Sequence, residues 1–190
     1  MDEVSRTADV YEDDAAAFIE KYRAESVAER FGDEFYAHLR GERILDVGCG
    51  PGIDTETFVD GGFDVVAFDL TRPFIEAAQA SVPDASFVQG DMRHLPFAEN
   101  TFDGVWSCAS FLHIPTADAT DTLREFRRIL DDDGVVYLSV YRGEESGYHT
   151  DGRYFERYLP DEVRSLVAGV GFDSIALQDD QTWLKVVAQV

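Results

Sequence analysis

Lysine is almost absent from this chain of 190 residues. Only Lys21 and Lys185 are lysines, and the 16 basic residues face 38 acidic ones, for a formal net charge of -22. Basic residues gather into no stripe, so the sequence argues against unaided binding to nucleic-acid phosphates. The acidic residues are spread along the whole chain. Such spread acidity favours adaptation to high salt, as in a halophile, over one local patch that binds a cationic partner.

Cysteine and long apolar runs are scarce as well. Two lone thiols, Cys49 and Cys108, predict neither a disulfide framework nor a metal site, and they fit a reducing cytoplasm. No apolar run reaches the roughly 18 residues of a membrane span. The acidic N-terminus lacks the basic and apolar regions of a signal peptide. We therefore expect a cytoplasmic protein without a membrane or metal, in which the acids Asp131–Asp133 form a solvated turn.

The first 40 residues favour a helical arm in front of the main fold. Residues 1–10 look frayed. One helical face then carries Ala15, Phe18, Ile19 and Tyr22, and a second helical face carries Val27, Phe31, Phe35 and Leu39. Gly32 weakens that second helix locally. We expect one domain over 1–190, with an arm or lid at 1–40 and a core at 41–190.

After residue 42, short apolar runs alternate with helical patterns. Predicted strands cover 44–47, 64–69, 86–89, 102–108 and 135–140. Predicted helices cover 52–60, run from Thr71 to about residue 80, and begin at Thr116 and Pro160, with a polar stretch at 141–158. The alternation predicts a doubly wound, Rossmann-like α/β sheet of seven strands, mostly parallel, with helices on both faces. Two closely connected strands, near 173–178 and 183–190, should form an antiparallel hairpin at its edge.

Glycines at alternate positions follow the first strand, in the pattern Asp46-x-Gly48-x-Gly50-x-Gly52. Glycines let backbone approach a ligand or take a positive φ, and a helix N-terminus offers free N–H groups to that ligand. Asp69 ends the second strand about 20 residues after Gly48, the distance expected for an acid that binds ribose hydroxyls. A dinucleotide fingerprint would place its third glycine at Ile53.

The glycine turn and its leading Asp46 resemble the first motif of class I S-adenosylmethionine-dependent methyltransferases of the small-molecule type (type 11/25-like). The resemblance implies S-adenosylmethionine as cofactor, with Cys49 in the turn and Leu70 on the adenine face, although Leu70 as a core residue is an equal alternative. Gly90-Asp91 resembles the motif that holds the adenine amine, followed by Met92. The segment after the fourth strand resembles the motif beside the methionine end and the acceptor, which implies that Ser107 and Cys108 line the site.

Other candidate residues surround the expected acceptor site. His113 is the one candidate general base, because imidazole suits that role near neutral pH, with a hydrogen-bonded structural residue as the alternative. The resemblance places Tyr148, His149, Arg153 and Tyr154 near the acceptor, and Tyr11 and Tyr22 over the cofactor. For the four residues near the acceptor, the alternative is a solvated loop with buried aromatic anchors.

These residues predict transfer of a methyl group to an unidentified small molecule by in-line displacement. A nicotinamide-dependent oxidoreductase and a non-catalytic S-adenosylmethionine-binding module are the alternatives. A protein acceptor stays open, whereas a nucleic-acid acceptor would call for a basic face. The sequence fits a monomer or a homodimer equally well.

Overall fold

The computed structural model describes residues 2–190. Its helices are α1 (Glu3–Asp13), α2 (Ala15–Tyr22), α3 (Val27–Phe31), α4 (Asp33–His38), α5 (Ile53–Asp60), α6 (Arg72–Ser81), α7 (Thr116–Ile129) and α8 (Pro160–Gly169), with a 3-10 turn η1 at Phe111–His113. Its strands are β1 (Arg43–Val47), β2 (Asp64–Asp69), β3 (Ser86–Gln89), β4 (Phe102–Ser107), β5 (Leu130–Arg142), β6 (Gly147–Tyr148), β7 (Tyr154–Phe155), β8 (Arg157–Tyr158), β9 (Asp173–Asp179) and β10 (Trp183–Gln189).

The central sheet has the strand order β3-β2-β1-β4-β5-β10-β9, and β8 adds a short pairing to β5. Strands β1 to β5 run parallel, whereas β10 pairs antiparallel with both β5 and β9. This order confirms the predicted Rossmann-like sheet and its antiparallel hairpin. The order reverses between β1 and β4, and ligands of such sheets bind at the carboxyl ends of strands near that reversal.

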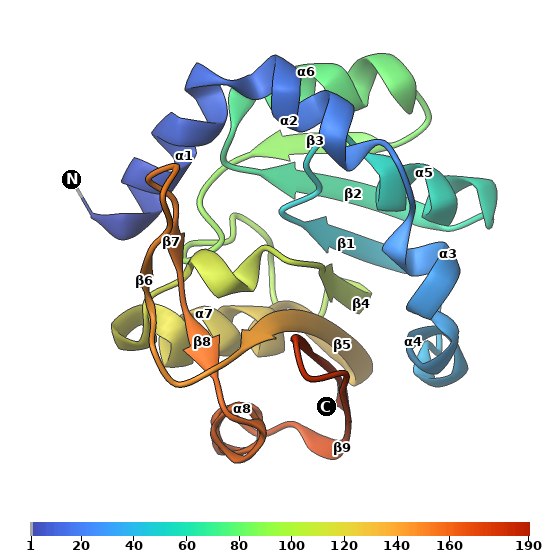
Figure 1. The fold of residues 1–190 in the computed structure, drawn as a ribbon. Coiled ribbons are helices and arrows are strands. Elements are labelled where there is room, and N and C mark those ends of the chain that lie inside the picture. The colour runs from blue at the N-terminus through green and yellow to red at the C-terminus, as the bar shows by residue number, and fades with distance from the viewer. Residues whose placement is uncertain (1) are drawn as a thin grey trace.

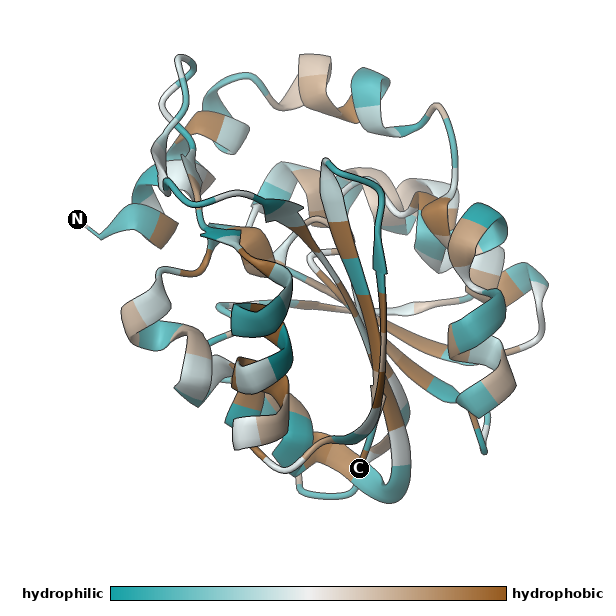
Figure 2. Cartoon of the chain, turned by 60° about the horizontal axis from the view of Figure 1, so that its bottom comes forward, coloured by the Kyte–Doolittle hydropathy of each residue, from teal (hydrophilic) through white to brown (hydrophobic). Residues whose placement is uncertain are grey.

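Helices cover both faces of the sheet, as Figures 1 and 2 show. Alternate strand residues point to opposite faces, so Leu45 and Val47 pack with Phe126 of α7, whereas Ile44 packs with Phe35 of α4. Figure 2 shows that hydrophobic colour concentrates in the central strands. In Figure 1, α1 lies beyond the carboxyl ends of β1 and β2, and α2 continues from it beside α6.

Two predictions for the arm were wrong. Residues 3–10 are not frayed, because α1 begins at Glu3 behind the N-cap Asp2, whose carboxylate accepts a bond from the Ser5 amide at 2.8 Å; Met1 lies outside the described residues. Burial of Val4 holds this helix to the fold. The expected single helix from Val27 to Leu39 is two short helices, α3 and α4, that meet at Gly32.

The predicted acidic turn at 131–134 was also wrong. These residues belong to β5, where the register against β4 shifts between Phe102 and Gly104. The strand therefore absorbs the acids as an irregularity, and their side chains stay exposed while Gly134 is buried. The polar stretch 141–158 forms the hairpin β6–β7 and the short strand β8.

Candidate functional site

A cavity of about 500 Å³ lies at the carboxyl ends of β1, β2 and β4, beneath the arm. Thirteen of the predicted site residues line it, which shows that the chain brings most of them together. They are Tyr11, Tyr22, Asp46, Gly48, Cys49, Gly50, Asp69, Leu70, Asp91, Met92, Cys108, His113 and Arg153.

The glycine turn forms one wall of this cavity. Gly48, Gly50 and Gly52 all have positive φ, at 73°, 54° and 89°. A Cβ on Gly48 would come within 2.2 Å of the Ser110 Cβ, so that glycine is required by packing. A Cβ on Gly50 would meet nothing within 4 Å, so this glycine leaves open space on the cavity side. A ligand can therefore approach the backbone closely at Gly50.

Asp69 joins the second strand to the glycine turn. Its carboxylate accepts the Gly50 amide at 2.9 Å on one oxygen and the Thr71 amide at 2.7 Å on the other. Burial raises the pKa of Asp69, while these amide bonds oppose the shift. Each carboxylate oxygen retains a lone pair for a further donor. The position and the free lone pairs suit recognition of a pair of hydroxyls.

Asp46 lies behind the turn and accepts the Thr55 hydroxyl at 2.6 Å. Burial is the main reason that its pKa rises to about 8, and the negative charge of Asp54 adds to that rise. The carboxyl group is thus poised between its neutral and charged forms near neutral pH. A cationic ligand group beside Asp46 would favour the charged form.

Sequence reasoning missed Asp54, which fixes the arm to the turn. One carboxylate oxygen accepts the Ser26 hydroxyl at 2.8 Å and the amides that open α3, at 2.8 and 3.0 Å. The other oxygen accepts the Trp106 indole at 2.9 Å. An acid in the first turn of the helix after the glycines was the available signal, but its partners are distant in sequence.

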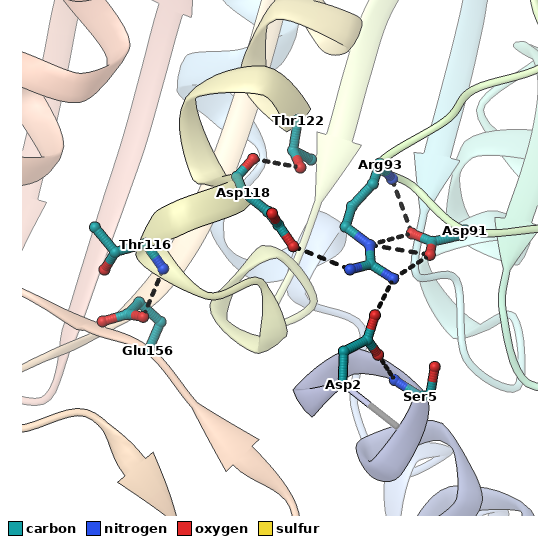
Figure 3. A network of polar contacts seen from close by, with 8 residues as sticks. All are labelled: Asp2, Ser5, Asp91, Arg93, Thr116, Asp118, Thr122 and Glu156. Atoms are coloured by element: carbon teal, nitrogen blue, oxygen red, sulfur yellow. Dashed lines mark hydrogen bonds and ion pairs between the residues drawn. The ribbon is translucent and has the colours of Figure 1, made fainter.

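Asp91 lies on the β3 side of the cavity, and the Arg93 guanidinium binds its carboxylate. The guanidinium of Arg93 contacts both Asp91 oxygens, with the shortest distance at 2.7 Å, and also reaches Asp2 and Asp118 at 2.9 Å each (Figure 3). Arg93 therefore ties the start of α1 and the start of α7 to the predicted adenine-binding acid. This link has no local sequence signal, because Asp2 and Asp118 are remote in the chain.

His113 stands at the centre of a polarised hydrogen-bond chain. Its Nδ1 lies 2.6 Å from the Tyr154 carbonyl, which can only accept, so Nδ1 carries the proton. Its Nε2 then accepts the Tyr11 hydroxyl at 2.9 Å. Burial lowers the pKa of His113 to about 4. The imidazole is neutral near pH 7, and its free lone pair is occupied by Tyr11.

Arg153 continues this chain and holds the arm. Its Nη1 donates to the hydroxyls of Tyr11 and Tyr22, at 2.9 and 3.0 Å. Asp151 binds the other side of the guanidinium, with Nη2 to Oδ2 at 2.7 Å. The rings of Phe18 and Phe155 lie within 5.0 Å of the guanidinium carbon. Although Arg153 is a cation, it is only 7% exposed, so it acts as a buried clamp.

Five predicted site residues lie outside the cavity lining. The Ser107 hydroxyl bonds to Ser110 at 2.7 Å in the buried interior, and Gly52 packs on Ala78. Tyr148 is 48% exposed and stacks under Arg6. His149 is exposed beside Asp151, and Tyr154 contributes its carbonyl to His113 while its hydroxyl binds Glu156.

The two thiols both border the cavity. Burial raises the pKa of Cys49 well above its ordinary value, and it raises the pKa of Cys108 as well. Neither thiol is ionised near neutral pH. Among residues 2–190, no cluster of side chains suits a metal ion, and no helix combines the length and apolarity needed to cross a membrane.

The order of this sheet, its glycine turn and its strand-end acids agree with a known family. A family model described as a methyltransferase domain matches residues 44–134. This part of the chain is therefore similar to that family. The predicted resemblance to class I S-adenosylmethionine-dependent methyltransferases is thereby confirmed.

Relatives of this methyltransferase domain differ in what they act on. A demethylmenaquinone methyltransferase of Paenarthrobacter aurescens is 32% identical over 101 residues, covering 53% of this chain and 39% of the relative. A malonyl-[acyl-carrier protein] O-methyltransferase of Pseudescherichia vulneris is 32% identical over 133 residues, covering 66% and 52%. This chain thus spans about half or less of the length of these relatives.

Solved structures extend the likeness to the whole chain. The Burkholderia thailandensis 1,6-didemethyltoxoflavin-N1-methyltransferase, with bound 1,6-didemethyltoxoflavin and S-adenosylhomocysteine, aligns with a TM-score of 0.76 at 22% identity. The alignment covers 100% of this chain and 91% of that one. The fold of the methyltransferase domain therefore continues through the arm and the C-terminal hairpin.

Proposed function

We propose that this protein is an S-adenosylmethionine-dependent methyltransferase that acts on a small-molecule acceptor. The observation that carries the proposal is the buried Asp69 carboxylate, which is bonded to the Gly50 amide and lines the cavity beside the open side of that glycine. This arrangement suits a ribose with its two hydroxyls against Asp69 and the adjoining chain against Gly50. The family match agrees with the same cofactor.

The remaining lining residues fit the rest of the cofactor. Leu70 and Met92 offer apolar surface for the adenine, and Asp91 can accept from its amine while Arg93 holds the carboxylate in place. Asp46, with a pKa raised to about 8, can pair with an ammonium group. Lys21 lines the same cavity and can face a carboxylate. The residues present therefore match the charges and the apolar parts of S-adenosylmethionine.

Bound at this site, the cofactor would supply a methyl group to a lone pair of the acceptor, and its sulfur would keep the electron pair of the broken bond. The chain's own residues position the acceptor and limit water around it. The arm supplies Tyr11 and Tyr22 to this cavity, and Arg153 holds both hydroxyls. Because the Nε2 of His113 already accepts from Tyr11, His113 takes a positioning role with Tyr11 in this arrangement.

The two alternatives have less support. A nicotinamide-dependent oxidoreductase would use a third fingerprint glycine, and Ile53 occupies that position at the start of α5. A non-catalytic module would bind the cofactor without turnover. The cavity extends to Tyr141 of β5 and Trp183 of β10, which supports space for an acceptor and favours an enzyme.

Isothermal titration with S-adenosylmethionine, in about 1 M potassium chloride to screen the acidic surface, tests the proposal. We expect micromolar binding by the wild type and a loss of about tenfold or more in Asp69→Asn, because hydrogen bonds to a charged group are worth about 1.5–3 kcal/mol. Asp84→Asn, an exposed acid outside the cavity, is the matched control and should bind as the wild type does. A folded wild type that prefers NAD, or that binds neither ligand, would overturn the proposal.

The setting of the enzyme is a further part of the proposal. The net charge of -22 supports work at high salt, where dense carboxylates are screened. Two free thiols support a reducing cytoplasm. A monomer and a homodimer are both compatible with the described surface, and size-exclusion chromatography with light scattering in molar salt distinguishes them.

A further inference from the structure

Beyond the expected cofactor, the cavity continues along a row of aromatic rings. Trp183 and Tyr141 lie with ring centroids 4.3 Å apart, and Tyr141 lies 5.5 Å from Phe155. Phe155 in turn lies 4.8 Å from His113, whose ring is 5.6 Å from Tyr11. All five residues line the cavity. We call Tyr141, Phe155 and Trp183 the aromatic wall.

Three separate elements converge to build the aromatic wall. Tyr141 is near the carboxyl end of β5, Trp183 opens β10 directly opposite it, and Phe155 belongs to β7. Tyr141 and Trp183 pack against the core but stay only half-buried. Since both line the cavity, their uncovered surface is available to a ligand. Half-covered aromatic rings at a strand end favour a partner that completes their burial.

The charges around the aromatic wall restrict what it can bind. Strands β5 and β10 and the β6–β7 hairpin contribute four described lining residues, Tyr141, Arg153, Phe155 and Trp183, of which only Arg153 is charged. Asp151 already neutralises that guanidinium through two bonds, at 2.7 and 3.0 Å. The Arg157 guanidinium lies over the Tyr141 ring at 5.1 Å, but Arg157 is not among the residues that line the cavity. A charged ligand group inside the cavity would therefore lose its hydration at the wall without a free counter-charge in the lining. The wall therefore favours an uncharged ligand.

Tyr11, at the end of the row of rings, determines which hydrogen-bonding group a ligand can present there. Its hydroxyl donates to His113 and accepts from Arg153, so its proton is committed and one lone pair is left. The phenol stays protonated, because burial raises the pKa of Tyr11. A ligand can bond to Tyr11 only as a donor, through a hydroxyl or an N–H group.

We propose that the methyl acceptor is a flat, uncharged aromatic ring system that stacks on the aromatic wall and points a hydroxyl or N–H group toward Tyr11. This inference rests on the proposed methyltransferase function and names the substrate class of the same cavity. Trp183 is then a specificity-determining residue, because its ring supplies stacking surface at the far end of the wall from Tyr11.

Three probes of similar size test whether the cavity prefers a flat ring and whether it prefers an uncharged one. We would titrate the complex with S-adenosylhomocysteine using 2-naphthol, which is flat and neutral, 2-naphthoate, which is flat and anionic, and 2-decalol, which is neutral and not flat. We expect 2-naphthol to bind about tenfold more tightly than either of the others, because stacking favours it over 2-decalol and avoided desolvation favours it over 2-naphthoate, each by about 1.4 kcal/mol. Equal or tighter binding of 2-naphthoate or 2-decalol would overturn the inference.

Variants assign this preference to the aromatic wall. Trp183→Leu should weaken 2-naphthol by about tenfold and leave the affinity for S-adenosylhomocysteine unchanged, which also reports that the variant is folded. Trp183→Phe should restore most of the loss. Phe31→Leu is the matched control, because this exposed ring lies outside the cavity.

The outcomes separate the two proposals. A wild type that does not bind S-adenosylhomocysteine overturns the proposed function, and the inference with it. Binding of S-adenosylhomocysteine without binding of 2-naphthol overturns the inference alone. Equal losses of both ligands in Trp183→Leu and Trp183→Phe would assign the wall to the cofactor and overturn the inference as well. Tyr141→Leu repeats the measurement from the neighbouring strand.

Discussion

His113 is a buried titratable side chain whose protonation the fold resists. Its Nδ1 donates to a carbonyl, its Nε2 accepts from Tyr11, and Arg153 adds a positive charge nearby. A second proton would have to displace the Tyr11 hydroxyl and sit close to a guanidinium. The pKa is therefore lowered to about 4, with burial as the largest cause.

This shift makes stability depend on pH in one direction. The ordinary pKa is 6.5, so below that value the unfolded chain takes up a proton that the folded chain refuses until about pH 4. Stability from this group is complete above pH 6.5 and declines as pH falls toward 4. At about pH 5 the loss should be about 2 kcal/mol relative to neutral pH.

Urea unfolding of the wild type and His113→Gln, at about pH 7 and about pH 5, measures the effect. Carboxylates titrate in both proteins, so the difference between the two pH responses isolates the histidine. We expect a smaller decline in His113→Gln. An identical decline in both proteins would show that His113 contributes no linkage.

Single residues differed in how far the sequence could place them. The pattern of Gly48, Gly50 and Asp69 predicted a shared location, because strand ends of a parallel sheet meet at one edge. Tyr154 was expected in the cavity by its side chain, but it acts through its carbonyl, which no residue type can signal. Asp54 and Arg93 each have partners in the arm, and only the packed chain brings them together.

Among the elements, α1 and α2 depend on a few polar clamps. Arg153 binds hydroxyls from both helices, and Arg93 binds the residue that caps α1. α2 has no fully buried residue, so little apolar burial holds it. Elements with few buried apolar contacts open more easily than the core.

Replacing Arg153 by lysine should loosen the arm selectively. Lysine keeps the charge but lacks the planar fork that binds two tyrosines and Asp151 together. The lost hydrogen bonds are worth about 1.5–3 kcal/mol, so amide hydrogen exchange in α1 and α2 should rise by about tenfold or more. Exchange in β1, β4 and β5 should not change.

Arg124→Lys provides the control for that experiment. Arg124 forms an exposed pair with Asp121 on α7, away from the arm. Its replacement should leave exchange in α1 and α2 as in the wild type. Faster exchange spread over the whole sheet in Arg153→Lys would indicate global destabilisation and contradict the role of a local clamp.

Element boundaries were predictable where pattern and packing agree. The strand at Asp64–Asp69 matched the predicted range, because its apolar run is bounded by glycines and a helix-capping threonine. Helix α1 was not predicted, because its sequence is mostly polar and does not reveal that Val4 and Thr7 are buried in the folded chain. The run Asp131–Asp133 has the composition of a turn, and it belongs to β5 only because Leu130 and Val135 on either side of it pair with β4 across a register shift.

At the scale of the whole molecule, charge repulsion opposes the folded state. A net charge of -22 is spread over a folded surface, and most acids have no basic partner available among 16 basic residues. The screening length falls from about 10 Å in 0.1 M salt to about 3 Å in 1 M salt. Salt should therefore stabilise this protein by weakening repulsion between carboxylates.

Thermal unfolding across a potassium chloride series tests this expectation. We expect the midpoint to rise by about 10 °C between about 0.1 M and 1 M salt, which corresponds to about 3 kcal/mol for a chain of this size. Sucrose raises stability by exclusion without screening charge, so it serves as the comparison. A midpoint that is flat or falls with salt would contradict both the electrostatic account and the proposed salt adaptation.

The raised pKa values of Cys49 and Cys108 have a practical consequence for following the arm in solution. Thiol-directed dyes react with the thiolate, and both native thiols stay protonated near neutral pH. A cysteine placed at exposed Glu20 on α2 would therefore take up a maleimide dye first, on a background that needs no prior removal of native thiols. Single-site fluorescence could then report each opening and closing of the arm in an otherwise unaltered protein.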